Sequence, residues 1–309
     1  MYECRLRQDF CNPRAISKAY FWARVNPVDL VIKYNYSACL VRVQPQTNPI
    51  MTTNQDIQFE MRDEIAVISL TRPTKRNALN DALIASLKHI FENLPQSARA
   101  AVITGQGEHF CAGLDLSDLK ERDAGQGMHH SRSWHYALER LQYGPVPVVA
   151  ALQGAVVGGG LELASACHIR VADESAFFAL PEGTRGIFVG GGGSVRIPRL
   201  IGVARMTDMM MTGRVYNAVD AERIGLAQYL VPVGAAFDKA MELAKKIATN
   251  APMTNYALMH ALPRIAEQPS DQGFITESLI SGIAQSTPQA KQRVRDFLEG
   301  RAAKVSKAS

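Results

Sequence analysis

The sequence predicts an α/β fold followed by a section made only of helices. Apolar residues alternate with polar ones in the first part of residues 57–70, which is typical of paired strands. Short apolar runs then alternate with segments of helical spacing up to about residue 249. After Ala251 the pattern is helical throughout. We therefore expect a sheet-containing core that precedes a helical C-terminal region.

The core begins with a predicted β-hairpin. Ile57, Phe59 and Met61 alternate with polar residues, and an apolar run at residues 65–70 follows a short charged turn. The dipeptide Arg72-Pro73 ends this second strand.

A helix is predicted next, capped by the side chain of Asn80 or Asp81. Its apolar positions recur at helical spacing: Leu83, Leu87, Ile90 and Leu94.

The remaining elements are predicted from the same strand alternation and helical spacing of apolar residues. Strands are expected at residues 100–104, 146–151, 169–171 and 176–180. Helices are expected at residues 161–166, 204–211, 218–224 and 236–249. Prolines divide the helical region that follows, at Pro252, Pro263, Pro269 and Pro288.

Residues 1–50 differ from the rest of the chain. They contain seven aromatic residues and three of the five cysteines, and they supply +4 of the formal net charge of +5. We expect Met51 to be the natural start and residues 1–50 to be a disordered, dispensable extension. A transit peptide is the competing interpretation, but no Arg-rich amphipathic helix is evident. The core then spans residues 51–235 and the helical region spans residues 236–309.

The composition excludes several classes of protein. Of the 309 residues, 47% are hydrophobic and 20% are charged, as in soluble globular proteins. No apolar run reaches the roughly 18 residues that a membrane-spanning helix needs. Beyond residue 50 the chain is almost neutral, so a basic face for nucleic acid is not expected. The cysteines lack a zinc-binding spacing, which predicts a metal-free cytoplasmic protein with reduced thiols.

Three glycine-bearing stretches carry the candidate chemistry: residues 110–116, 154–164 and 181–187. The second places three glycines at residues 158–160, between a strand and a helix. Glycine lets the backbone approach a ligand, and the first N–H groups of a helix have no internal partner. Such a position suits a developing oxyanion or a phosphate. A P-loop is excluded because no Gly-Lys-Ser/Thr follows, and the dinucleotide-binding spacing is also absent.

Two glutamates accompany these glycines. Glu162 lies in the first turn of the helix, and Glu182 follows Pro181 where a strand gives way to a loop. Each alone is compatible with a purely structural role, since an acidic residue near a helix N-terminus is favoured by the helix dipole. Together they suggest paired carboxylates that share acid and base work on one water.

In these motifs the sequence resembles the crotonase (enoyl-CoA hydratase/isomerase) superfamily from about residue 57 to residue 301. The motifs occur in the family's order: Arg72-Pro73 with Asn77-Ala78-Leu79, residues 110–116, residues 147–151, residues 158–164, Pro181-Glu182 and Thr212-Gly213. The resemblance implies a spiral of ββα units whose C-terminal helices make trimer contacts, in a homotrimer or a dimer of trimers.

The resemblance also implies residue roles. The two oxyanion-hole N–H donors fall on Leu114 and Gly159, and the two catalytic glutamates fall on Glu162 and Glu182. Contacts to coenzyme A, which is part of the substrate rather than a cofactor, fall on Lys75, Arg76, Ala78, Asp115, Leu116 and Ser117. A solvated basic turn is the competing interpretation for the side chains of Lys75 and Arg76.

The presence of both glutamates favours hydration of an enoyl-CoA thioester. Other reactions of the superfamily are alternatives, namely isomerisation, thioester hydrolysis and C–C cleavage. One hydratase relative binds RNA through a lysine-rich helix, but residues 81–94 offer only Lys88 and His89 as basic candidates, which disfavours that function here.

Several positions depart from the family pattern. His168 replaces the usual Asp, and we expect a structural histidine there. Phe188-Val189 replaces the commoner Ile-Pro, which changes the expected wall around the acyl chain, and Ser117 replaces a Lys found in some hydratases. His129, His130 and His135 are interpreted as part of a mobile segment at the acyl pocket rather than as metal ligands.

Other residues are interpreted as packing groups. Met206, Met209, Met210 and Met211 are assigned to a core or subunit contact. Cys111 and Cys167 are interpreted as small buried residues and not as nucleophiles.

Overall fold

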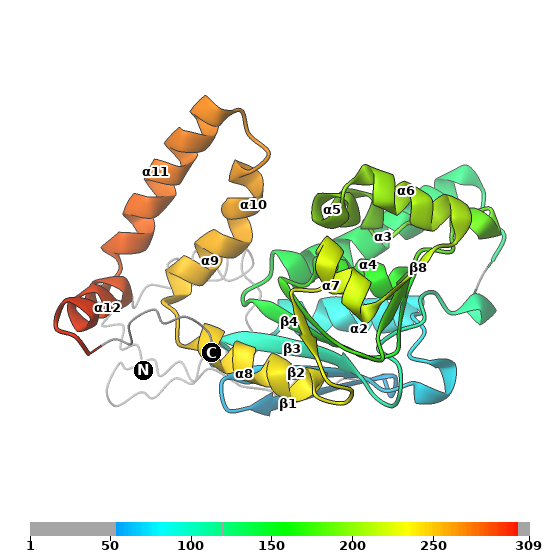
Figure 1. The fold of residues 1–309 in the computed structure, drawn as a ribbon, viewed down its shortest axis with the longest axis horizontal. Coiled ribbons are helices and arrows are strands. Elements are labelled where there is room, and N and C mark those ends of the chain that lie inside the picture. The colour runs from blue at the N-terminus through cyan, green and yellow to red at the C-terminus, as the bar shows by residue number, and fades with distance from the viewer. Residues whose placement is uncertain (1–53, 119, 302–309) are drawn as a thin grey trace, which may run out of the picture. The chain divides into compact units, whose positions relative to one another are not determined.

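The computed structural model describes residues 54–118 and 120–301, so the predictions made for residues 1–50 lie outside the described residues. Two β-sheets form the centre of the described chain (Figure 1). The larger sheet has the spatial order β1 (Ile57–Arg62), β2 (Ile65–Leu70), β3 (Ala100–Gly105), β4 (Val148–Leu152), β6 (Ile169–Asp173) and β9 (Tyr229–Val231). The smaller sheet contains β5 (Ala155–Val157), β7 (Phe177–Ala179) and β8 (Val215–Asn217).

Strand pairing agrees with the sequence pattern. β1 and β2 are antiparallel, as the predicted hairpin requires, and the other neighbours in the larger sheet are parallel. In the smaller sheet β5 and β7 are parallel, whereas β7 and β8 are antiparallel. The α/β fold class is therefore confirmed.

Helices pack around these sheets: α2 (Asp81–Glu92), α3 (Ala124–Gln142), α4 (Gly159–Ala166), α5 (Gly193–Ile201), α6 (Val203–Thr212), α7 (Ala218–Ile224) and α8 (Ala236–Ala248). The last of them, α8, covers one face of the larger sheet, where Ala240 and Ala244 join Val102 and Val149 in one buried apolar cluster. Although α8 begins the region that the sequence assigned to the C-terminal helices, it packs as part of the core.

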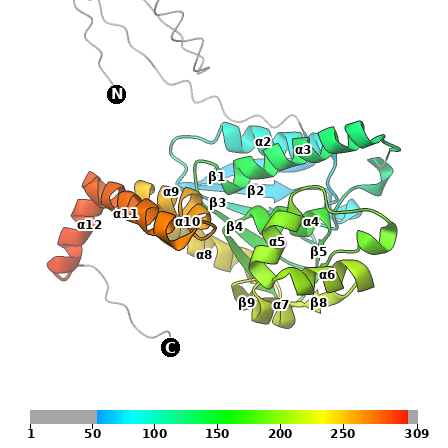
Figure 2. The same ribbon diagram turned by 90° about the horizontal axis from the view of Figure 1, so that it is seen from above.

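Four helices follow α8 and extend beside the core in both views (Figures 1 and 2): α9 (Pro252–His260), α10 (Leu262–Ile265), α11 (Ser270–Ser286) and α12 (Pro288–Leu298). We call α9–α12 the C-terminal arm. The helical pattern predicted for this region is present. Large apolar side chains of α11 and α12 are exposed, with 50–76% of their surface accessible: Phe274, Ile275, Leu279, Ile283, Val294, Phe297 and Leu298.

Three local predictions needed revision or completion. Asn80 caps α2 by accepting a hydrogen bond from the Leu83 N–H at 2.8 Å, but the helix ends at Glu92 and leaves Leu94 outside. Residues 129–135, expected to belong to a mobile segment, lie within the helix α3, which begins at Ala124 after a capping box between Asp123 and Gln126. The helix α5 was not predicted.

No helix within the described parts of the chain combines the length and apolar character needed to cross a membrane.

The loop between β2 and α2 is fixed by a buried asparagine. Asn77 adopts φ +54°, is fully buried, and its side chain makes three hydrogen bonds to backbone groups. Its carboxamide oxygen accepts from the Arg72 N–H at 2.9 Å, and its NH₂ group donates to Gln106 O at 2.9 Å and His109 O at 2.7 Å. Asparagine tolerates this left-handed conformation better than most residues do.

We expect Asn77→Ala to lower the free energy of unfolding by about 3 kcal/mol, because three buried hydrogen bonds are lost and the positive φ is retained. Urea unfolding followed by far-UV circular dichroism measures the change. Asn93→Ala, at an exposed position, should change the same quantity by less than about 0.5 kcal/mol. Equal effects of the two substitutions would contradict the structural role of Asn77.

Candidate active site

The start of α4 presents an unpaired backbone donor. Gly158 turns the chain between β5 and α4 with φ +53°, and its own N–H donates to Ala179 O at 2.9 Å. The next residue, Gly159, opens the helix, and its N–H has no acceptor among the described residues. The helix dipole adds a positive partial charge at the same place.

A second unpaired donor lies beside the first. The loop at residues 111–114 runs along β5, where the Cys111 N–H donates to Ala155 O at 2.9 Å and Cys111 O accepts from the Val157 N–H at 3.0 Å. The loop then brings the Leu114 N–H close to α4, since a Cβ added at Gly159 would lie 3.5 Å from Leu114 N. The Leu114 N–H also lacks an acceptor among the described residues. Two adjacent free N–H groups form a suitable oxyanion hole.

Glycine makes this approach possible at residue 113. Gly113 has φ +97°, and a Cβ there would lie 2.8 Å from Val157 O and 3.3 Å from Gly159 N. A larger residue would push the two donor segments apart.

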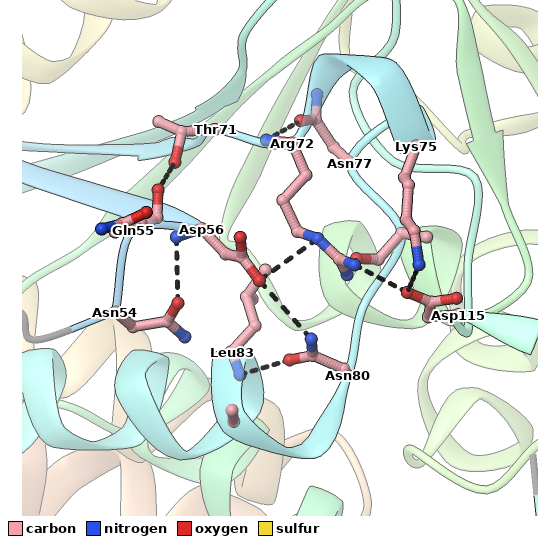
Figure 3. Close-up of polar contacts among 12 residues, drawn as sticks. Asn54, Gln55, Asp56, Thr71, Arg72, Lys75, Asn77, Asn80, Leu83 and Asp115 are labelled. Atoms are coloured by element: carbon pink, nitrogen blue, oxygen red, sulfur yellow. Dashed lines mark hydrogen bonds and ion pairs between the residues drawn. The ribbon is translucent and has the colours of Figure 1, made fainter. Parts of the chain in front are cut away.

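The partly buried guanidinium of Arg72 also holds this loop (Figure 3). Arg72 donates to Asp115 Oδ2 at 2.7 Å and to Ala78 O at 2.8 Å, and it pairs with Asp56 at 3.2 Å. Leu79 hydrogen-bonds to the residues before and after Leu114: its N–H donates to Gly113 O, and its carbonyl accepts from the Asp115 N–H. The sequence indicates Arg72 only as part of a motif and as the end of a strand, whereas the structure shows its contact with the loop at Asp115.

The six residues expected to contact coenzyme A gather around this loop. Lys75 Nζ lies 3.0 Å from both Asp115 Oδ2 and Ser117 Oγ, so the lysine is paired within the chain. Leu116 and Ser117 are exposed, as are Lys75 and Arg76, whereas Ala78 and Asp115 are buried. Hydrogen bonds from Ser117, Lys75 and Arg72 hold the pKa of Asp115 well below its usual range. Asp115 is therefore ionised and bound within the chain.

Glu162 is buried and held by backbone donors. Its Oε1 accepts from the N–H groups of Gly191 and Gly193, both at 2.8 Å, and Gly193 is the first residue of α5. Burial raises the pKa of Glu162 to about 7. The two N–H groups and the charge of Arg196 oppose that rise, while the charge of Glu182 adds to it. The carboxyl can exchange a proton near neutral pH, as general acid–base chemistry requires.

Glu182 lies against the start of α4. A Cβ added at Gly158 would be 2.7 Å from Glu182 Oε1, and the residue is 8% exposed. Its Oε2 is buried without a hydrogen-bond partner among the described residues. Burial also raises the pKa of Glu182. A buried carboxyl oxygen with free bonding capacity next to Glu162 can bind a water or a substrate atom.

The helix α3 provides a wall beside the donors. The Trp134 ring lies 3.3 Å from the position of a Cβ at Gly159, and its indole N–H donates to Asp81 Oδ1 at 3.0 Å. His130 also bonds to Asp81 Oδ1, at 2.8 Å. Within the described residues, no three His, Cys, Asp or Glu side chains form a group that could hold a metal ion.

His168 is placed as a structural residue. Its Nδ1 accepts from the Val148 N–H at 3.0 Å, and its Nε2 lies 2.9 Å from Gln142 O. Burial lowers the pKa of His168 to about 4, so the imidazole is neutral. Both thiols, Cys111 and Cys167, are buried, and burial raises the pKa of each to about 12, which agrees with packing roles.

Of the methionines assigned to a core or subunit contact, Met206 and Met209 are buried in the core, whereas Met211 is 77% exposed in the single chain. In the loop that departs from the family pattern, Phe188 is 68% exposed and Val189 is buried.

A family model for enoyl-CoA hydratase/isomerase matches residues 60–307. The chain is 33% identical over 242 residues to 2,3-dehydroadipyl-CoA hydratase of Escherichia coli strain K12, covering 78% of this chain and 94% of the relative. It is 32% identical over 249 residues to the short-chain-enoyl-CoA hydratase of Clostridium acetobutylicum, covering 80% and 95%.

Solved structures show the same architecture. A Rhodopseudomonas palustris protein, described provisionally as an enoyl-CoA hydratase, is 56% identical with a TM-score of 0.78, covering 80% of this chain and 95% of that one. The enoyl-CoA hydratase of Bacillus anthracis is 34% identical with a TM-score of 0.75, covering 80% and 97%. The crotonase-like fold expected from the sequence is confirmed.

The raised pKa of Glu162 makes the stability of the protein depend on pH. Above pH 7 the folded state holds a buried charge that the unfolded chain hydrates, so this residue costs stability there. We expect Glu162→Gln to raise the free energy of unfolding by about 3 kcal/mol at pH 8, and the gain to narrow as pH falls from 7 towards 4.5.

Urea unfolding at several pH values measures this difference. Glu222→Gln, at an exposed position of α7, serves as the control and should show no comparable gain. A gain from Glu162→Gln that is the same at pH 4.5 and pH 8 would refute the raised pKa.

Proposed function

We propose that this chain, which belongs to the enoyl-CoA hydratase/isomerase family, is an enoyl-CoA hydratase that adds water across the 2,3 double bond of its substrate. The observation that carries the proposal is the placement of two buried glutamates against the start of α4, where two free N–H groups converge. One of the two carboxyls, on Glu182, keeps an unpaired oxygen.

The backbone donors account for activation of the substrate. The N–H groups of Leu114 and Gly159 would bind the thioester carbonyl oxygen as it gains enolate charge. Such a donor is typically worth about 3–4 kcal/mol of barrier, because it is oriented before the reaction begins. This polarisation makes Cβ electrophilic.

The glutamates account for the addition of water. The pair holds one water, and one carboxylate takes a proton from it as its oxygen bonds to Cβ. The other carboxyl delivers a proton to Cα, so the hydrogen and oxygen of water are both retained in the product. The raised pKa values of Glu162 and Glu182 suit a pair that shares one proton near neutral pH.

The CoA portion is assigned to the exposed edge of the loop that contains Leu114. Lys75, Arg76 and Ser117 are accessible there, and the backbone of Ala78, Asp115 and Leu116 runs alongside. The basic side chains are available to phosphate groups, although Lys75 must exchange its contact with Asp115 to bind one.

Another reaction of the same superfamily is the second candidate, because an oxyanion hole also serves isomerisation, thioester hydrolysis and C–C cleavage. Isomerisation does not consume water, so crotonyl-CoA and a 3-enoyl-CoA distinguish these reactions. The cytoplasmic location predicted from the sequence remains part of the proposal, although one relative, from Arabidopsis thaliana, is named as mitochondrial.

Loss of either carboxyl should disable hydration. We expect Glu162→Gln and Glu182→Gln each to lower kcat for crotonyl-CoA by roughly 10²–10⁴-fold, since general acid–base catalysis is removed while the backbone donors remain. The absorbance of the conjugated enoyl thioester reports the reaction directly. Glu222→Gln is the matched control and should retain wild-type kcat. If wild type hydrates crotonyl-CoA and either glutamate variant is unimpaired, the paired-glutamate mechanism is wrong.

The C-terminal arm supports self-association into a homotrimer or a dimer of trimers. Large apolar side chains on α11 and α12 are exposed and are not covered by any other part of the described chain.

We expect Phe274→Asp to reduce the molecular mass in solution, because burying a carboxylate in an apolar contact is costly. Size-exclusion chromatography with light scattering measures the mass, and Val233→Asp, at another exposed apolar position on the core, is the control. An unchanged mass for Phe274→Asp would exclude α11 from the contact.

A further inference from the structure

Arg196 lies in the first turn of α5 and folds back over the glycine turn that starts this helix. The residue is 9% exposed. Its Nη1 donates to Gly191 O at 2.9 Å, and its Nε donates to Gln142 Oε1 at 2.7 Å. Gly192 has φ +96°, and a Cβ at this residue would lie 2.3 Å from Arg196 Nη1. The guanidinium therefore rests directly on the turn.

The same turn holds the carboxyl of Glu162. The N–H groups of Gly191 and Gly193 donate to Glu162 Oε1, while the carbonyl of Gly191 faces the guanidinium. Arg196 thus contacts the turn from the side opposite to Glu162, and it makes no ion pair with that carboxylate within the described residues. Its second anchor, Gln142, is the last residue of α3, so the arginine links the turn before α5 to the end of α3.

We infer that Arg196 is a positioning residue for the proposed reaction, holding the glycine turn so that two N–H groups remain aimed at Glu162. This inference rests on the proposed hydratase function. The planar guanidinium reaches the Gly191 carbonyl and the Gln142 side chain at once, in directions that a lysine ammonium cannot reproduce. Without the guanidinium, the turn loses its link to Gln142 at the end of α3, and its remaining hydrogen bond to that helix among the described residues runs from Ser131 Oγ to Gly190 O, at 2.7 Å.

The positive charge of Arg196, like the two N–H groups, favours the ionised form of Glu162. The groups that bear on Glu162 are Glu182, from the loop after β7, and Arg196 on α5. From α3, the charge of Glu139 acts on Arg196, and His135 lies close enough to Arg196 for its own pKa to be lowered by that charge. The strand β5 carries no titratable side chain. Removing the cation therefore raises the pKa of Glu162.

The test compares Arg196→Gln and Arg196→Lys with Arg199→Gln in the full-length protein. Arg199 lies on the same helix with its side chain half exposed and paired with Glu267. We expect Arg196→Gln to lower kcat for crotonyl-CoA by roughly 10²-fold with little change in KM, as misplacement of a reacting group does. The limb of the pH–rate profile that reports Glu162 should move to higher pH, whether this carboxyl acts as acid or base. Arg196→Lys should restore the pH limb but not the full kcat, and Arg199→Gln should match wild type.

A measurement without substrate separates this inference from the proposed function. In protein labelled with ¹³C at glutamate carboxyls, the Glu162 resonance, identified by its absence in Glu162→Gln, should titrate at higher pH in Arg196→Gln than in wild type. If wild type does not hydrate any enoyl-CoA but this shift is observed, the proposed function fails while the coupling of Arg196 to the Glu162 carboxyl stands. An unchanged titration, or a loss confined to KM, overturns the positioning role.

Discussion

The site depends on one constraint, the close approach of the loop at residues 111–114 to the start of α4. A Cβ at Gly160 would lie 2.3 Å from Cys111 O, and one at Gly113 would lie 2.8 Å from Val157 O. Real Cβ atoms do not approach other heavy atoms this closely, so glycine at these two positions allows the separation observed between the loop and α4. Only at that separation do the N–H groups of Leu114 and Gly159 converge, and Arg72 keeps the loop in place through Asp115.

The two glutamates proposed as acid–base groups depend instead on burial and on hydrogen bonding to their carboxyls. Glu162 is nearly inaccessible to water, which by itself would make its charged form costly. The N–H groups of Gly191 and Gly193, in the turn that starts α5, offset part of that cost. The carboxyl of Glu162 therefore exchanges between its protonated and ionised forms near neutral pH. Glu182 differs, because one of its oxygens has no partner. The two carboxyls therefore have unequal environments although both are buried near the start of α4.

Much of this arrangement could be read from the sequence. The strand and helix periods were strong enough to predict the hairpin, most core elements and the helical arm. The resemblance of the glycine motifs to the crotonase superfamily implied the two donors and the two glutamates, which lie together at the start of α4. Contacts between distant segments could not be read in the same way. Arg72 reaches Asp115 across 43 residues, and no local pattern shows that pairing. The helix α3 was missed because Gly125, Gly127 and several polar residues weaken its period, and its capping box was overlooked. The glycines before α5 concealed that helix, since they resemble a loop.

The two halves of the site differ in how mutation can alter them. The proposed oxyanion donors belong to the main chain, so replacing the Leu114 side chain leaves the N–H of that residue in place. The carboxyls belong to single side chains, and one nucleotide change converts a glutamate codon into one for glutamine. A lineage with this architecture can therefore exchange its proton-transfer groups while it keeps the means of polarising a thioester. New reactions can arise on such a scaffold by side-chain replacement, without evolution of a new fold.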